Sequence, residues 1–151
     1  MIDDTDWKIL RVLQAEPDLS INALAEKVGL SHTPCWRRLK KLEDDGVIVA
    51  RAVILDGHKL GLGVDVFANL RLSRHDEDTL TSLEQAVQKH AEIVECFLIG
   101  GESDYLIRVV VGSIEEYERF LKKVLVHLPG VAAVNSSFAM QRVKLTTRLP
   151  I

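Results

Sequence analysis

The chain has 151 residues, of which 47% are hydrophobic and 27% charged, a composition that excludes an intrinsically disordered chain and suits one domain or two small ones. Its formal net charge is −3, so the chain as a whole lacks the basic character of a nonspecific nucleic-acid coat. The two cysteines, Cys35 and Cys96, form neither a zinc motif nor a disulfide framework. We therefore expect no metal and no cofactor.

The first predicted element is a helix over residues 4–16. Apolar side chains recur there at helical spacing, and acidic ones gather near the positive N-terminal end of the helix. Pro17 follows directly, and proline cannot continue a helix. The helix is therefore expected to end before it.

Two further helices are predicted on either side of a tight turn at Gly29. Ser20 suits the N-cap of the first of them, and Ser31 or Thr33 suits the N-cap of the second. Gly46 suits the left-handed residue that ends the second helix. Two helices that meet at such a turn form a helix-turn-helix, in which the second helix enters the major groove of double-stranded DNA.

The second helix of this pair has one apolar face and one basic face. At about 100° per residue, Cys35, Leu39 and Leu42 share a narrow stripe, so we expect Cys35 to be buried rather than redox-active. The opposite face has hydroxyls, an aromatic ring and cations, and no acid before Glu43. A phosphate backbone favours that mixture. The candidate DNA-contacting residues are Ser31, His32, Thr33, Trp36, Arg37, Arg38, Lys40 and Lys41.

A change of pattern after this helix marks the end of the first domain. Residues 47–55 are rich in β-branched side chains and predict a strand, the wing of a winged helix-turn-helix. The glycine-containing stretch 58–63 then predicts a hinge. We expect a DNA-binding domain over residues 1–60 and a second domain over residues 61–151. A lone G-x-G in this hinge is too little for a dinucleotide fingerprint.

The second domain alternates between strand and helix patterns. Strands are predicted over 64–72, 93–99, 105–111 and 131 to about 147, and helices over 76–91 and from Ser113 to about Leu128. The order β-α-β-β-α-β matches a ferredoxin-like sandwich, so the fold class is α+β. Strands 93–99 and 105–111 are largely apolar on both faces, and the helices suffice to cover one. We therefore expect a homodimer in which a partner sheet covers the other face.

Several motifs together resemble one family. They are Ile2-Asp3-Asp4-Thr5-Asp6, Leu30-Ser31-His32-Thr33-Pro34-Cys35, Leu42-Glu43-Asp44-Asp45-Gly46-Val47-Ile48, Gly101-Glu102-Ser103-Asp104-Tyr105 and Gly130-Val131. Over nearly its whole length the chain resembles the Lrp/AsnC (feast/famine) transcription regulators. The resemblance implies sequence-specific DNA binding by a winged helix-turn-helix, and control by an amino acid or related small metabolite bound to a RAM/ACT-like domain. It also implies dimers that assemble further into octamers, as tetramers of dimers.

The hairpin between strands 93–99 and 105–111 is the candidate effector site. Its glycines allow close approach of a ligand, its acids suit an α-ammonium group, and exposed backbone N–H groups suit a carboxylate. The candidate residues are Gly100, Gly101, Glu102, Ser103, Asp104, Tyr105, Ser136 and Ser137. The two serines belong to this set if the last strand, or that of a neighbouring subunit, passes near the hairpin. From the residues alone, an ordinary acidic β-turn is the simpler interpretation.

The residues alone leave alternatives open. An RNA-binding winged helix and a small metabolic enzyme on a ferredoxin-like domain are the competing functions, although the absence of nucleophile-elbow, P-loop and metalloprotease motifs argues against an enzyme. His32 is as consistent with a solvent-exposed loop residue, Trp36 with a cover for the core rim, and Arg38 with pairing to an acid instead of a phosphate. No apolar run approaches the ~18 residues of a membrane span, and the acidic N-terminus does not resemble a signal peptide. We expect a cytoplasmic protein with no membrane partner.

Overall fold

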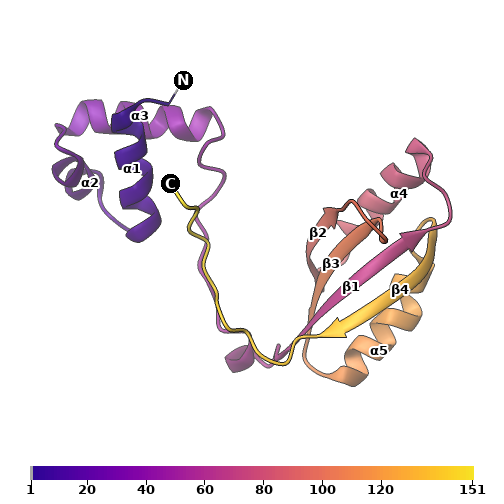
Figure 1. Cartoon of the computed structure of the whole chain (residues 1–151). Coiled ribbons are helices and arrows are strands. Elements are labelled where there is room, and N and C mark those ends of the chain that lie inside the picture. Colours follow the sequence, from indigo (N-terminus) through magenta and orange to yellow (C-terminus); the bar gives the residue numbers. More distant parts are fainter. Residues whose placement is uncertain (1) are drawn as a thin grey trace. The chain divides into compact units, whose positions relative to one another are not determined.

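The computed structural model describes residues 2–151, which fold into two compact units (Figure 1). The first unit contains the residues up to Ile54 together with Val143–Ile151, and the second is Leu55–Arg142. The last nine residues therefore belong to the first unit, although the sequence places them in the second domain. The backbone of Leu149 holds this C-terminal tail there: its N–H donates to Gln14 Oε1 (2.6 Å), and its carbonyl accepts from Gln14 Nε2 (3.3 Å).

The first unit contains the three helices that the sequence predicts. They are α1 (Asp4–Ala15), α2 (Ile21–Val28) and α3 (His32–Asp44). Asp3 caps α1 and forms a capping box with Asp6, while Ser20 caps α2. Gly29 (φ +75°) and Gly46 (φ +71°) adopt the left-handed conformation that ends a helix. The helix-turn-helix prediction is thus confirmed.

The helices of the first unit enclose a small apolar core. Cys35 is fully buried in it, as the stripe on α3 predicts, and burial raises the pKa of its thiol. The other buried apolar residues are Ile9, Leu10, Leu24, Ala25, Val28 and Leu42. This core leaves the opposite side of α3 in solvent.

The prediction of a strand over residues 47–55 is wrong. The N–H groups of Val47 and Ile48 donate to the carbonyl of Leu42 in α3, and the rest of the segment has no regular secondary structure, with Val49 and Val53 90% and 84% exposed. A strand is stabilised only by hydrogen bonds to a neighbour. Within residues 2–151 no second strand pairs with this segment. Its β-branched composition alone is therefore not enough to form a strand.

The second unit is a four-stranded antiparallel sheet with helices on one face (Figure 1). Its elements are η1 (His58–Leu60), β1 (Val64–Leu72), α4 (Glu77–Val87), β2 (Ile93–Leu98), β3 (Tyr105–Val111), α5 (Ile114–Lys123), η2 (Leu125–His127) and β4 (Val131–Phe138). The strand order is β2-β3-β1-β4, with β2 and β3 joined as a hairpin. The predicted β-α-β-β-α-β order is confirmed.

Alternation along the strands separates a covered face from an open face. β3 alternates strictly between buried and half-buried residues, and its buried residues pack with those of β1 against the helices. On the other side, Phe97 and Phe67 are 54% and 38% exposed. We call this side the open face; its residues are Asp65, Phe67, Asn69 and Arg71 of β1, Glu95 and Phe97 of β2, Leu106, Arg108 and Val110 of β3, and Ala133, Asn135 and Ser137 of β4.

Three predicted boundaries in the second unit extend too far. β4 ends at Phe138 rather than near 147, because Phe138 already pairs with Val66, close to the start of β1. Beyond that point β1 offers only Asp65, whose carbonyl accepts the N–H of Ala139 (3.0 Å), and Val64, its first residue. The predicted helix from Ser113 to about Leu128 is α5 followed by the tighter turn η2, which keeps its apolar side inward. Similarly, α4 ends at Val87 rather than at residue 91.

Candidate DNA-binding face and effector turn

The outward side of α3 presents an aromatic ring and cations that no other side chain neutralises. Trp36 is 51% exposed, and Arg37 and Lys41 are exposed as well. Within residues 2–151, neither Arg37 nor Lys41 forms an ion pair. Because all three side chains lie on the side away from the core, they are accessible to a phosphate or to a base edge.

The first turn of α3 adds polar groups to this side. Ser31 is the N-cap residue by its backbone (φ −79°, ψ 163°), but its side chain makes no capping hydrogen bond. His32 and Thr33 are exposed beside it. The unpaired N–H groups of a helix N-terminus attract an anion, and a free hydroxyl is available next to them.

Two of the predicted DNA-contacting cations are held by acids of the chain. Lys40 Nζ lies 2.9 Å from Asp44 Oδ1, one turn along α3, and this pair raises the pKa of Lys40. Arg38 Nη1 donates to Asp3 Oδ2 (2.6 Å) and to Asp6 Oδ1 (2.8 Å). The sequence left Arg38 open between an acid and a phosphate, and the structure provides the acid. The spacing of Asp3 and Asp6 indicates a helix cap, but no sequence pattern indicates that they also bind Arg38.

The β2–β3 hairpin turn is open to solvent at its tip. A Cβ atom built on Gly100 would meet nothing within 4 Å, and Gly101 has a φ of +129° that favours glycine. Within the described residues, the backbone N–H groups of 100–103 form no hydrogen bond. Glu102 is exposed and its carboxylate forms no ion pair there, while its carbonyl accepts from Arg71 Nη2 (3.3 Å).

Asp104 already has partners inside the unit. Its Oδ2 accepts the N–H of Leu72 at the end of β1 (2.7 Å), and its Oδ1 lies 2.8 Å from His75 Nε2. The hydrogen bond from the Leu72 N–H, and then the one from His75, lower the pKa of Asp104 below its ordinary value. Nothing in the sequence pattern pointed to His75.

The remaining predicted effector residues do not gather at the turn. Tyr105 is 1% exposed and its hydroxyl donates to Glu84 Oε1 (2.8 Å). Burial and then that hydrogen bond raise the pKa of Tyr105 to about 12. Ser136 hydrogen-bonds to the hydroxyl of Tyr117 on the covered face, whereas Ser137 lies on the open face opposite Phe67. Within one chain, the two serines are separated from the hairpin by β3 and β1.

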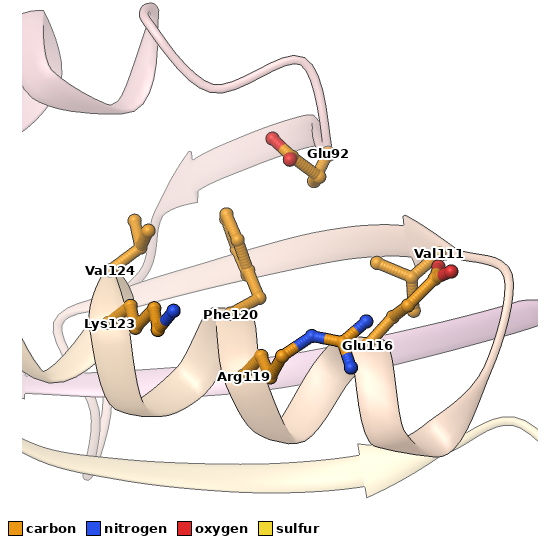
Figure 2. A pocket seen from close by; sticks show the side chains of 7 residues that line it. All are labelled: Glu92, Val111, Glu116, Arg119, Phe120, Lys123 and Val124. Carbon is orange, nitrogen blue, oxygen red and sulfur yellow. The ribbon is translucent and has the colours of Figure 1, made fainter.

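A shallow cleft of about 330 Å³ lies at the other end of β3 (Figure 2). Phe120 of α5 and Val124, the residue directly after that helix, point toward Glu92 across it, and Arg119 lies along its rim. The lining residues are Glu92, Val111, Glu116, Arg119, Phe120, Lys123 and Val124. Since β3 has seven residues, cleft and hairpin turn are about 20 Å apart along the strand. No sequence pattern indicated this cleft.

Comparison with known proteins identifies the family. The model of the Lrp/AsnC ligand binding domain matches residues 65–149, and a winged helix-turn-helix DNA-binding model matches residues 2–49. The DNA-binding transcriptional activator DecR of Escherichia coli K12 is 41% identical over 151 residues, which is 100% of this chain and 99% of DecR. The chain belongs to the Lrp/AsnC family. Lrp/AsnC proteins are DNA-binding transcriptional regulators rather than enzymes, so this chain is a regulator of that type.

Solved Lrp/AsnC structures have the same fold along the whole chain. The transcriptional regulator NMB0573 of Neisseria meningitidis, solved in complex with L-Met, has a TM-score of 0.92 and 36% identity, covering 99% of this chain and 97% of that one. An AsnC family regulator of Agrobacterium tumefaciens has a TM-score of 0.85 and 42% identity, covering 98% and 96%. In the described part of this Lrp/AsnC chain, no helix has the length and apolar character that crossing a membrane requires.

Proposed function

We propose that this Lrp/AsnC regulator acts as a cytoplasmic homodimer without catalytic activity. In this proposal α3 of each copy binds a half-site of a DNA operator, and an α-amino acid bound at the β2–β3 hairpin controls the complex. The observation that carries the DNA-binding part is the exposed side of α3, where Trp36, Arg37 and Lys41 have no partner within residues 2–151.

The residues on α3 divide into expected roles. Ser31, His32 and Thr33 lie at the N-terminal turn, the part of a recognition helix that is nearest the base edges. Arg37 and Lys41 are free to bind phosphate or guanine. Lys40 joins them, because its pair with Asp44 is exposed on both sides and exposed ion pairs contribute little to stability. A phosphate can therefore displace Asp44.

The open face of the sheet supports dimerisation. Its two arginines and two acids balance in charge: Arg108 lies 3.0 Å from Asp65 and 2.7 Å from Glu95, while Arg71 Nη2 donates to the carbonyl of Glu102 (3.3 Å). Around this cluster Phe67 and Phe97 remain exposed. A face with exposed aromatic rings and balanced charges can be covered by an identical face, so a second sheet is a suitable partner.

Phe97→Asp tests the dimer. A carboxylate buried in the proposed interface has no partner there, so we expect monomers at micromolar concentration in light scattering, where the wild type is expected to be a dimer. Ile114→Asp is the matched control, because Ile114 is an exposed apolar residue of the same unit at the start of α5. A wild-type monomer, or an unchanged Phe97→Asp dimer, would refute this interface.

The free groups of the hairpin support an amino-acid effector. The unused N–H groups of 100–103 suit a carboxylate, and the unpaired Glu102 suits an ammonium group. Asp104 already accepts hydrogen bonds from Leu72 and His75, so its main role is to stabilise the turn. Only its remaining lone pairs are free to accept a hydrogen bond from the ammonium group. The L-Met complex of the Neisseria meningitidis relative supports the ligand class.

Operator binding is tested by fluorescence anisotropy with the DNA upstream of the regulated gene. Arg37→Ala is expected to weaken binding by about 1–3 kcal/mol if Arg37 reads a guanine, or to lower the salt slope by about one if it binds phosphate. Arg11→Ala, an exposed cation of α1, is the control. Equal affinity of wild type and Arg37→Ala, or preference for RNA of the same sequence, would contradict the proposal.

The effector is tested by a thermal-shift screen of the twenty amino acids on the full-length protein. A ligand that binds only the native state raises the melting temperature, and calorimetry then measures its affinity. We expect Glu102→Gln to weaken the binding of the selected amino acid, and Gly100→Ala to obstruct it without altering the fold, since a Cβ there meets open space. Binding heats identical to wild type in both variants would exclude the hairpin as the site.

A further inference from the structure

We propose that Arg38 is a positioning residue: with Asp3 and Asp6 it fixes the orientation of the recognition helix α3 against α1, and it does not itself contact DNA. This inference rests on the proposed DNA-binding role of α3, and it goes further by assigning the arginine on that helix that sequence reasoning grouped with the DNA contacts. It also gives Asp3 and Asp6, at the start of α1, the role of holding that arginine.

The geometry is that of a forked ion pair between two helices. One nitrogen of Arg38, Nη1, lies 2.6 Å from Asp3 Oδ2 and 2.8 Å from Asp6 Oδ1. The side chain of Asp6 is only 9% exposed and that of Arg38 is 35% exposed. Charge-assisted hydrogen bonds of this length to a sheltered carboxylate are strong and directional. Arg38 is therefore committed to α1.

The two carboxylates are themselves tied to the start of α1. Asp3 Oδ1 accepts the N–H groups of Thr5 and Asp6, and Asp6 Oδ2 accepts the N–H of Asp3. Each acid thus uses one oxygen for the helix cap and the other for Arg38. Without the guanidinium, two carboxylates would remain close together, one of them nearly buried, and their repulsion would have no counterion.

This pair fixes a direction that apolar packing leaves free. Cys35 and Leu42 bury α3 against the core, but apolar contacts are non-directional and tolerate small rotations and shifts. Arg38 directly follows Arg37 in the helix, about 100° around the axis. Holding Arg38 toward α1 therefore fixes the direction of Arg37, which points to DNA in the proposed complex.

Neutralising Asp6 distinguishes positioning from DNA contact by the sign of its effect. If Arg38 binds phosphate, Asp6 competes with the operator, and Asp6→Asn must bind DNA more tightly. If Arg38 positions α3, Asp6→Asn loosens the helix and weakens binding. Any lost acid also reduces general repulsion of DNA, so Asp4→Asn is the matched control: Asp4 is an exposed acid in the same turn and is not a partner of Arg38.

We expect the operator Kd of Asp6→Asn to be about fivefold or more above that of Asp4→Asn, with an unchanged salt slope. Asp3→Asn is the second variant, since asparagine caps a helix about as well as aspartate but gives no charge to Arg38. Its Kd should rise in the same direction by a smaller factor. Circular dichroism melting confirms that each variant is folded at the assay temperature.

Hydrogen exchange without DNA provides a readout that is independent of the proposed function. Amides of 32–44 should exchange faster in Asp6→Asn than in Asp4→Asn. Tighter operator binding by Asp6→Asn than by Asp4→Asn, or equal exchange in the two variants, would overturn the positioning role. Failure of the proposed DNA-binding function would instead appear as no effect of Arg37→Ala on operator binding.

Discussion

The outward side of α3 and the β2–β3 hairpin differ in what their predicted site residues already contact. On α3, Trp36, Arg37 and Lys41 are exposed without partners within residues 2–151. At the hairpin, Tyr105 and Asp104 form hydrogen bonds inside their own unit. A polar residue in a turn motif can therefore stabilise the fold rather than bind a ligand. Substitutions of Trp36, Arg37 and Lys41 should change binding without changing stability, and substitutions of Tyr105 and Asp104 should do the reverse.

The largest difference in stability is expected between alanine variants of the two aromatic residues of the predicted sites, Tyr105 and Trp36. Tyr105→Ala empties a fully buried position, so we expect a loss of about 3–5 kcal/mol in the free energy of unfolding of the second unit. Trp36→Ala, half exposed on α3, should cost about 0.5 kcal/mol or less while weakening operator binding. Urea denaturation followed by far-UV circular dichroism measures both. Similar losses of unfolding free energy in the two variants would contradict the proposed difference between the two sites.

Alkaline pH should destabilise the second unit through Tyr105. Its pKa is about 12 in the folded chain and 10.0 in the ordinary state, so above pH 10 the unfolded chain releases a proton that the folded chain keeps. Stability then falls as pH rises from 10 to 12, by about 2 kcal/mol in total. Tyr105→Phe has no proton to lose there, and its unfolding free energy should depend less on pH over this window. Parallel curves for both proteins would argue against the shift.

Asp104 should stabilise the hairpin more than it serves the ligand. Asp104→Ala leaves the Leu72 N–H without its acceptor, at a cost of about 1–3 kcal/mol, whereas Asp104→Asn keeps an acceptor oxygen and should cost less. Because the pKa of Asp104 is lowered from 3.8, the carboxylate contributes above that pH and its contribution is lost as pH falls further. Melting temperatures at pH 7 and pH 3 measure this. Equal stability of Asp104→Ala and wild type would return Asp104 to the candidate ligands.

The smallest difference in stability is expected between alanine variants of the two N-cap serines of the first unit. The hydroxyl of Ser20 accepts the N–H of Ala23 (3.2 Å), while the hydroxyl of Ser31 makes no capping bond. Ser20→Ala should cost about 1 kcal/mol of stability, and Ser31→Ala should cost close to nothing while weakening operator binding. Thermal melts and anisotropy titrations of both variants test this. A stability loss in Ser31→Ala as large as in Ser20→Ala would show that its hydroxyl caps α3 in solution.

Local sequence patterns determined most of the secondary structure and the location of the DNA-binding face. Helical and strand periods depend on neighbours a few residues away, so α1, β1 and β3 follow the predicted ranges closely. The apolar stripe of α3 likewise determines which of its side chains face outward. Where an element needs a partner, local patterns were insufficient: residues 47–55 have strand composition but no pairing strand within residues 2–151, and β4 ends at Phe138, close to the first residue of its partner β1.

The contacts of individual polar groups were decided by the tertiary structure. Asp104 meets Leu72 across 32 residues, Arg38 meets Asp6 across the same separation, and the tail residue Leu149 meets Gln14 across 135. No periodicity relates positions so far apart, because chain packing and strand register determine which groups approach within 3 Å. The sequence determined which residues are able to bind DNA or an amino acid. The fold determined which of them are free to do so, because a buried polar group must find a partner within the protein.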